Sequence, residues 1–337
     1  MAAYATFGLA PATRAGALLA DGAYEVHREF LDFVVDGRPL LGRLADVDGV
    51  SPLAADLGPT VFTSQVRALL LEGLPPLPGG RHVIYACPEC EGLECGVVTA
   101  VIERDGADVV WRDFVWQTAP APDPARDGYR GVGPFRFRSA EYRAVLERLL
   151  ADGTCGARRV LLVGPRVSLF GRLAAALRSI GIGAEITRDA AGAHAEEIRT
   201  YGAVAFERDV GEGERSAVRA AFAAAGSDAV FIEAPAPAVP LLVAQVEQAL
   251  QRAPHALRRL TGLTAGAGRV HVGVAAACRV RLTGYRQDRF RRTRTVEVFE
   301  GRLEPGEHTV PLDAGLRAGA FLVARTTRDV LVTRLTS

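Results

Sequence analysis

Three cysteines lie close together in the sequence, at positions 87, 90 and 95, between two strand-like runs. Thiolates two residues apart on a turn can chelate one metal ion, as they do in zinc knuckles. A structural zinc site needs four ligands, and this segment supplies three of them. We therefore consider Cys87, Cys90 and Cys95 as candidate ligands of a zinc or iron ion.

The fourth ligand would have to come from another part of the chain. His82, Cys155 and a carboxylate such as Glu94 are the candidates. A zinc module usually carries two CxxC pairs, and only one such pair, Cys87 and Cys90, is present. Two other interpretations therefore stay open: thiols that form a reversible disulfide, and structural thiols in a hairpin loop. The incomplete pattern favours the structural thiols.

A second candidate site lies at residues 160–171, where a buried strand leads through Gly164 into a helix. A Rossmann phosphate loop has glycine at its second and third conserved positions, so that the backbone can approach a pyrophosphate. Arg166 and Leu169 occupy those two positions here. Their side chains predict that the usual approach of a dinucleotide is blocked.

Arginine could hold a phosphate in a different way, through its planar guanidinium group. Arg166 is placed to do so, and Arg188 and Asp189 follow the next strand, where a dinucleotide's ribose would be bound. The candidate cofactor-binding residues are Gly164, Arg166, Ser168, Arg188 and Asp189. The missing glycines favour a scaffold without a cofactor, and NAD(P) binding is the alternative.

An arginine-rich segment at residues 279–302 is the third candidate site. It contains eight arginines and three acidic residues, a local excess of five positive charges. Strand alternation places Arg279 and Arg281 on one face, and Arg292 and Arg294 on one face, as a possible anion patch. The overall charge of +1 and the lack of a DNA-binding motif favour solvated or paired arginines over a nucleic-acid partner.

The composition excludes several kinds of chemistry. The chain contains neither lysine nor asparagine. It therefore has no Walker-type phosphate loop, no lysine Schiff base and no Tyr/Lys pair of a short-chain dehydrogenase. The six histidines form no HExxH motif, and no Gly-x-Ser-x-Gly elbow is present. The sequence predicts no catalytic residue, and whether the chain is an enzyme stays open.

The elements around the cysteines predict an α+β domain at residues 23–152, after a flexible leader at residues 1–22. Residues 24–35 show partial alternation and end in a turn at Asp36 and Gly37, which predicts a hairpin. Further strands are expected at 82–86, 97–103 and 109–116, and helices at 62–71 and 139–150.

Residues 157–262 alternate between strand-like and helix-like runs. Strands are expected at 160–163, 184–187, 203–207 and 229–233, and helices at 169–180, 214–225 and 239–251. Such alternation predicts a parallel sheet of βαβ units, here a Rossmann-like central domain. Short runs separated by Gly, Pro and Asp at residues 267–337 predict a small antiparallel β-sandwich. The expected fold class is a multidomain α/β protein.

Residues 24–150 resemble a group of uncharacterised actinobacterial proteins, some of which are labelled oxidoreductase. The segments that carry this likeness are 34–40, 87–96, 101–104, 110–114 and 133–137, which include Cys87-Pro88-Glu89-Cys90 and Trp111-Arg112-Asp113-Phe114. Residues 158–251 are similar in layout to short-chain-dehydrogenase-like Rossmann domains, without their glycine loop and catalytic Tyr/Lys pair. Residues 300–323 resemble the terminal hairpins of immunoglobulin-like modules.

These features favour a non-catalytic binding or accessory protein, a role that could belong to a bacterial biosynthetic pathway. An NAD(P)-dependent oxidoreductase and a zinc- or iron-binding module are the alternatives. The odd number of cysteines, five, and the lack of a signal sequence predict reduced thiols in a cytoplasm. No run of eighteen apolar residues occurs, so no membrane association is expected. A protein or a small molecule is the expected partner.

Overall fold

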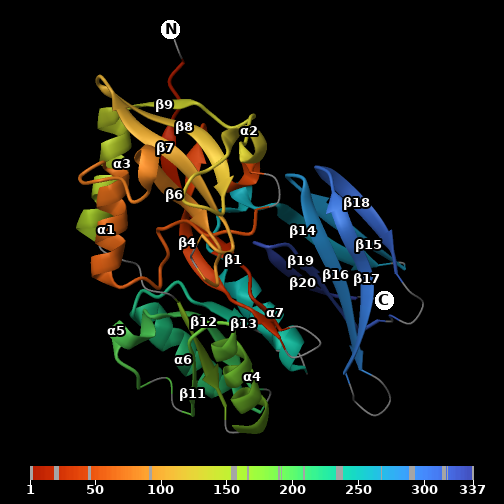
Figure 1. The fold of residues 1–337 in the computed structure, drawn as a ribbon. Helices are drawn as coiled ribbons and strands as arrows, with labels where there is room; N and C mark the ends of the chain where they lie inside the picture. Colours follow the sequence, from red (N-terminus) through yellow and green to blue (C-terminus); the bar gives the residue numbers. More distant parts are fainter. Residues whose placement is uncertain are drawn as a thin grey trace. The chain divides into compact units, whose positions relative to one another are not determined.

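The fold is mixed α/β, with one parallel sheet and several antiparallel sheets (Figure 1). The computed structural model describes residues 3–18, 23–44, 47–90, 93–152, 158–164, 167–188, 190, 192–207, 209–232, 238–266, 268–287, 293–312, 316 and 318–335. The chain forms two compact units. The first comprises Met1–Arg14 and Arg28–Gly156, and the second comprises Ala15–His27 and Ala157–Ser337.

The largest sheet of the first unit is antiparallel and has the strand order β6-β7-β8-β9. Its strands are β6 (Arg81–Ala86), β7 (Val97–Asp105), β8 (Asp108–Gln117) and β9 (Phe135–Arg138). A hairpin joins β7 to β8, because Asp105 pairs with Asp108 across a two-residue turn. Gly106 in that turn has a φ of +62°, a conformation that glycine adopts without strain.

The segment expected as a flexible leader contains a full-length strand, so that expectation is wrong. Strand β1 (Phe7–Arg14) pairs along its whole length with β4 (Arg28–Val35), and β5 (Arg38–Pro39) lies on the other side of β4. Pro11 is tolerated in β1 because β1 is an edge strand, where a missing N–H breaks no ladder bond. The turn predicted at Asp36 and Gly37 joins β4 to β5, and both residues have positive φ angles.

Helices pack beside these strands and complete the first unit. They are α1 (Pro59–Leu69), α2 (Pro124–Asp127) and α3 (Ser139–Asp152), with short 3₁₀ turns at Leu41–Arg43 and Pro78–Gly80. Figure 1 shows α1 and α3 lying next to each other. The core of the unit is aromatic, and its fully buried rings include Phe33, Tyr85, Trp111, Phe137 and Tyr142.

The second unit contains the parallel sheet. Its strands are β10 (Arg159–Val163), β11 (Ala184–Thr187), β12 (Tyr201–Phe206) and β13 (Val230–Ile232), and its helices are α4 (Val167–Ser179), α5 (Ala195–Ile198), α6 (Glu212–Ala224) and α7 (Val239–Leu250). Side chains alternate between two cores: Val160 and Leu162 pack in one, Leu161 and Val163 in the other. Both faces of the sheet are therefore buried, as expected for parallel strands.

The strand order of this sheet is β11-β10-β12-β13. The third strand in sequence thus lies beside the first, whereas in the Rossmann order the third strand lies beside the second. The predicted alternation of strands and helices is present, but the order differs from the one that the label Rossmann implies. In both orders, a ligand crevice is expected at the carboxyl ends of the strands where the strand order reverses, here between β10 and β12.

Two antiparallel sheets follow the parallel one. One has the order β14-β15-β18, and the other has the order β17-β16-β19-β20. Their strands are β14 (Leu260–Gly266), β15 (Arg269–Val274), β16 (Cys278–Gln287), β17 (Thr293–Leu303), β18 (Gly306–Pro311), β19 (Phe321–Arg325) and β20 (Val330–Arg334), and a 3₁₀ turn spans His255–Leu257. Buried residues of both sheets, such as Val272 and Leu282, share one core.

The expected boundary at residues 262–267 falls within β14, because this strand pairs with β15 along its length. Val323 and Val330 of the antiparallel part pack in the same cluster as Leu242 and Val246 of α7. The parallel and antiparallel sheets therefore belong to one unit rather than to two separate domains. A two-residue pair, β2 (Ala17–Leu18) with β3 (Tyr24–Glu25), also belongs to this unit.

Among the described residues, no helix has the length and apolar character needed to cross a membrane.

Candidate functional site

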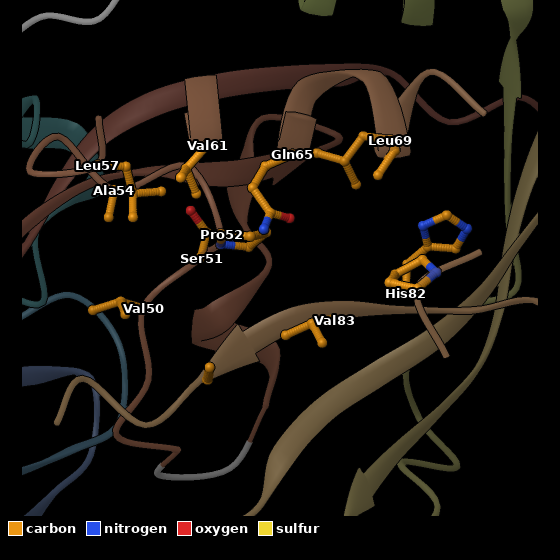
Figure 2. A pocket seen from close by; sticks show the side chains of 13 residues that line it. Val50, Ser51, Pro52, Ala54, Leu57, Val61, Gln65, Leu69, His82 and Val83 are labelled. Carbon is orange, nitrogen blue, oxygen red and sulfur yellow. The ribbon is translucent and has the colours of Figure 1, made fainter. Parts of the chain in front are cut away.

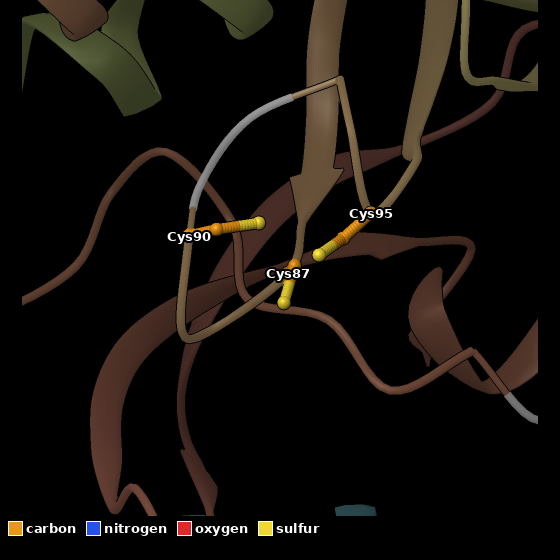
Figure 3. Close-up of side chains that lie close together, drawn as sticks. All are labelled: Cys87, Cys90 and Cys95. Atoms are coloured by element: carbon orange, nitrogen blue, oxygen red, sulfur yellow. The ribbon is translucent and has the colours of Figure 1, made fainter.

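The three cysteines meet at the connection between β6 and β7 (Figure 3). Cys87 follows the last residue of β6, and Cys95 comes two residues before the first residue of β7. Because Ala86 and Val97 pair across these antiparallel strands, the two ends of the loop lie beside each other. Figure 3 shows Cys90 and Cys95 pointing toward each other, with the Cys87 sulfur near both. The pairing of β6 with β7 thus brings the three cysteines together in space.

Contacts with neighbouring elements hold both ends of this loop. The Arg28 Nε donates a hydrogen bond to the Pro88 carbonyl at 3.1 Å. The backbone groups of Ala86 and Val50 exchange two hydrogen bonds, each 2.9 Å long. At the other end, Gly96 has a φ of +90° and packs so closely on the Trp116 indole that a Cβ would lie 2.7 Å from its Nε1. The position of Cys95 therefore depends on a glycine beside it.

The sulfur positions suit a single metal ion. All three Sγ atoms lie within 4.8 Å of one another. Two thiolates bound tetrahedrally to zinc at about 2.3 Å lie about 3.8 Å apart. The observed separations therefore need a contraction of about 1 Å at most to surround one ion. Cys87 is half-buried, and Cys90 and Cys95 are exposed, so the cluster opens to solvent.

The thiols also influence one another's protonation. Hydrogen bonding with Cys90 and Cys87, which favours the protonated thiol, raises the pKa of Cys95 to about 12. A thiol among thiols, without a cation, thus keeps its proton at neutral pH. A bound metal ion reverses this effect, because its positive charge favours the thiolate form.

None of the expected fourth ligands joins the cluster among the described residues. Within that part of the chain, no histidine, aspartate or glutamate contributes an atom to the group of three sulfurs, so Glu94 and His82 do not complete it. His82 is instead buried in a pocket next to helix α1. Cys155 lies outside the described residues. The described chain therefore supplies three ligands and leaves a fourth coordination position open.

The residues predicted to bind a cofactor are only partly described. Gly164 lies directly after β10, and Arg188 is exposed directly after β11. Ser168 is the second residue of α4, and its side chain is not described. Arg166 and Asp189 lie outside the described residues. The structure thus places Gly164 and Arg188 at the carboxyl ends of neighbouring parallel strands.

An acidic side chain lies where a phosphate would have to approach. A Cβ added to Gly164 would lie 2.5 Å from the Glu207 Cβ and 2.7 Å from its Oε2. Glu207 follows β12, is only 7% exposed and lies at the crevice between β10 and β12. The glycine therefore makes room for a carboxylate of the chain itself. A negative charge at this point repels a phosphate.

The predicted anion patch contains paired arginines. Arg279 and Arg281 both contact Glu300 on the neighbouring strand β17, at 2.7 and 3.3 Å. The Arg281 and Arg279 guanidinium groups lower the pKa of Glu300. Arg294 is exposed on β17, and Arg292 lies outside the described residues. Arg279 and Arg281 therefore pair with an acid of the neighbouring strand, and the anion patch as a whole stays a prediction.

A pocket that sequence analysis missed lies in the first unit. It is bounded by α1, the start of β6 and the segment around Ser51, and the buried side chain of His82 lines it. Sequence analysis considered His82 only as a zinc ligand. The one sequence signal for a buried His82 is its position in a strand of mostly apolar residues. The spacing of these residues does not predict a cavity beside it.

Comparisons with known proteins give no relative for this chain: no protein-family model matches it, and neither a curated protein nor a solved structure is significantly similar to it.

Proposed function

We propose that this protein binds one zinc ion through Cys87, Cys90 and Cys95 and serves as a non-catalytic binding or accessory protein. The convergence of three thiols within 4.8 Å of one another supports the proposal. Thiolates are the ligands that zinc prefers in structural sites, and three cysteine sulfurs on one strand connection already lie close enough to share an ion. Iron is the second choice for the same ligands, and metal analysis separates the two.

The open fourth position suggests how such a site would take part in binding. Zinc with three chain ligands accepts a fourth from water, a small molecule or another side chain. Because Cys90 and Cys95 are exposed, a fourth ligand could reach the ion from solvent or from a protein partner. Cys155 is the remaining candidate from the chain itself. The proposal therefore describes a binding site at the surface of the first unit.

The other functional predictions have less support. Glu207 beside Gly164 disfavours a dinucleotide phosphate at the parallel sheet, so the oxidoreductase alternative stays a prediction without a supporting contact. The description of the parallel part as a degenerate Rossmann scaffold and of the last strands as a β-sandwich also stays a prediction, as does the resemblance to actinobacterial proteins.

Metal analysis of the purified full-length protein tests the proposal. We expect about one equivalent of zinc per chain after incubation with zinc and removal of the excess, and less than about a tenth of an equivalent for Cys90→Ala. Because thiols must lose protons to bind zinc, we also expect the zinc affinity to fall as the pH is lowered.

Cys278→Ala is the matched control for this experiment. Cys278 is buried in the antiparallel core of the second unit, whereas the three clustered cysteines belong to the first, so its removal changes the cysteine count without changing the cluster. This variant should keep the full zinc content. A folded wild-type protein that holds less than about a tenth of an equivalent of zinc or iron would contradict the proposal.

A further inference from the structure

The pocket beside helix α1 has the size and lining of a small-molecule site (Figure 2). Its volume is about 170 Å³, and thirteen residues line it, all from the first unit. Most of the lining is apolar and includes Val50, Leu57, Leu69 and Val83. Buried apolar cavities of about 150 Å³ bind benzene in other proteins, so a ring of that size fits here.

His82 is the polar group that distinguishes this pocket from an ordinary packing defect. Its side chain is 2% exposed, and neither ring nitrogen has a hydrogen-bond partner among the described residues. Buried polar groups without partners are uncommon in native proteins, because each one costs free energy. Figure 2 shows the His82 side chain at one end of the pocket, on the side of Leu69, whereas the Gln65 amide lies nearer Ser51 and Pro52. A ligand that bonds the imidazole would remove this cost.

The charge state of the lining restricts the chemistry of that ligand. Burial lowers the pKa of His82, so its ring is neutral at neutral pH and offers one donor and one acceptor. Ser51 is already used, because its hydroxyl donates to the Leu31 carbonyl at 2.6 Å and accepts from the Leu53 N–H at 3.2 Å. Among the described lining residues, none carries a charge. A charged ligand would therefore be desolvated without a counter-charge.

We propose that this pocket binds a small neutral alcohol or phenol, with its apolar body against Leu69 and Val83 and its hydroxyl group hydrogen-bonded to His82. A hydroxyl group both donates and accepts, so it matches either tautomer of the imidazole. Gln65, half-buried on α1, also lines the pocket and adds a second polar side chain to it. This site is separate from the zinc proposal and does not depend on it.

Phenol and benzyl alcohol are the probes for a titration of the full-length protein, followed by calorimetry and by the ¹⁵N shifts of the histidine side chains. We expect saturable binding with a dissociation constant of about 1 mM or lower and a change in the His82 ring nitrogen shifts. Toluene, which lacks the hydroxyl group, should bind about five-fold more weakly. Benzoate, which has the same ring with a negative charge, should bind more weakly still.

Two variants test the assignment of the pocket. Ala68→Leu adds bulk to a lining position on α1 and should abolish binding of phenol and toluene alike. Its matched control is Ser64→Leu, the same added side chain at an exposed position of α1 that does not line the pocket. His82→Leu should weaken phenol binding about five-fold and leave toluene binding nearly unchanged.

Any one of the following results would overturn the proposal. They are a lack of saturable binding by folded wild-type protein at about 10 mM phenol, equal loss of binding in Ser64→Leu and Ala68→Leu, and benzoate binding as tight as phenol binding. If His82→Leu does not fold, the ¹⁵N shifts of wild-type His82 still decide whether the imidazole contacts the ligand. Unchanged shifts at saturation would also overturn it.

Discussion

At the scale of single residues, the shape of the cysteine loop depends on Gly96. This residue has a φ of +90°, and its Cα faces the Trp116 indole at a distance that leaves no room for a side chain. Trp116 lies in β8, the neighbour of β7, so the contact joins the cysteine loop to the sheet. Since Gly96 directly follows Cys95, its packing sets where the Cys95 sulfur lies relative to the other two.

We therefore expect Gly96→Ala to destabilise the first unit by about 2–4 kcal/mol, from a strained backbone and from overlap with the indole. The same change should weaken zinc binding, because the loop must shift. Urea unfolding followed by Trp fluorescence measures the first effect, and metal analysis measures the second. Gly106→Ala is the control: Gly106 also has a positive φ, +62°, but an added Cβ would meet no neighbouring atom. This variant should lower the free energy of unfolding by only about 1 kcal/mol. Equal losses in the two variants would show that the Trp116 contact is not important.

The spacing of Cys87, Cys90 and Cys95 made their proximity predictable, because short loops between paired strands bring their ends together. The pocket around His82 was not predictable in the same way. Its lining comes from residues 50 to 86, on a helix, a strand and two loops, and its volume depends on how α1 packs. Periodicity predicts which residues are buried, but it does not predict where packing leaves space.

At the scale of elements, strand β1 shows that the same residues are interpreted differently once the position of the strand in its sheet is known. An Ala-rich stretch with a proline indicates a leader when it is considered alone. At the edge of the sheet, Pro11 breaks no hydrogen bond between strands. Phe7 packs against the aromatic core. Its ring lies 4.5 Å from that of Tyr142 and 5.6 Å from that of Trp111. The strands at 82–86, 97–103 and 109–116 were predictable because each is a short run dominated by apolar, strand-favouring residues.

Phe7→Ala tests whether β1 is part of the core. We expect a loss of about 3 kcal/mol in the free energy of unfolding, since a half-buried ring that contacts four aromatic neighbours is removed. Chemical denaturation of the full chain gives this value. Tyr4→Ala removes an aromatic ring that is 47% exposed, three residues earlier, and should change stability by less than about 0.5 kcal/mol. A stability of Phe7→Ala equal to that of the wild type would restore the leader interpretation.

At the scale of the whole molecule, each compact unit is built from separated stretches of chain. Residues 15–27 belong to the second unit, although the residues on both sides of them belong to the first. This segment carries His27, whose Nδ1 lies 3.5 Å from the Glu247 Oε1. Arg325 contributes Nη2 at 2.5 Å from the Glu247 Oε2 and also donates to the Gly16 carbonyl. A buried carboxylate on α7 thus joins the early segment to strand β19.

No local sequence pattern could predict this network. His27 precedes Glu247 by more than two hundred positions, and Arg325 follows Glu247 by nearly eighty. Each of the three residues alone resembles an ordinary surface charge or a satisfied core histidine. Their meeting depends on the route of the whole chain through the second unit. Contacts between segments far apart in the sequence leave no local signal. For the same reason, the parallel and antiparallel sheets were expected to form separate domains.

Glu247→Gln tests how much this network stabilises the second unit. Burial alone would raise the pKa of Glu247, but Arg325 and His27 outweigh it and hold the pKa below its usual value of 4.5. A carboxyl group with a lowered folded-state pKa stabilises the protein above pH 4.5, and this contribution is lost as the pH falls through the folded-state value. Removing the charge leaves the half-buried Arg325 without its counter-charge, which costs about 3 kcal/mol at neutral pH. Urea unfolding should therefore show a large difference in the free energy of unfolding between wild type and Glu247→Gln at neutral pH, and this difference should shrink in acid.

Glu297→Gln, at an exposed position, is the control and should show little difference from wild type at either pH. A loss of stability in Glu247→Gln that does not change with pH would contradict the ionised network.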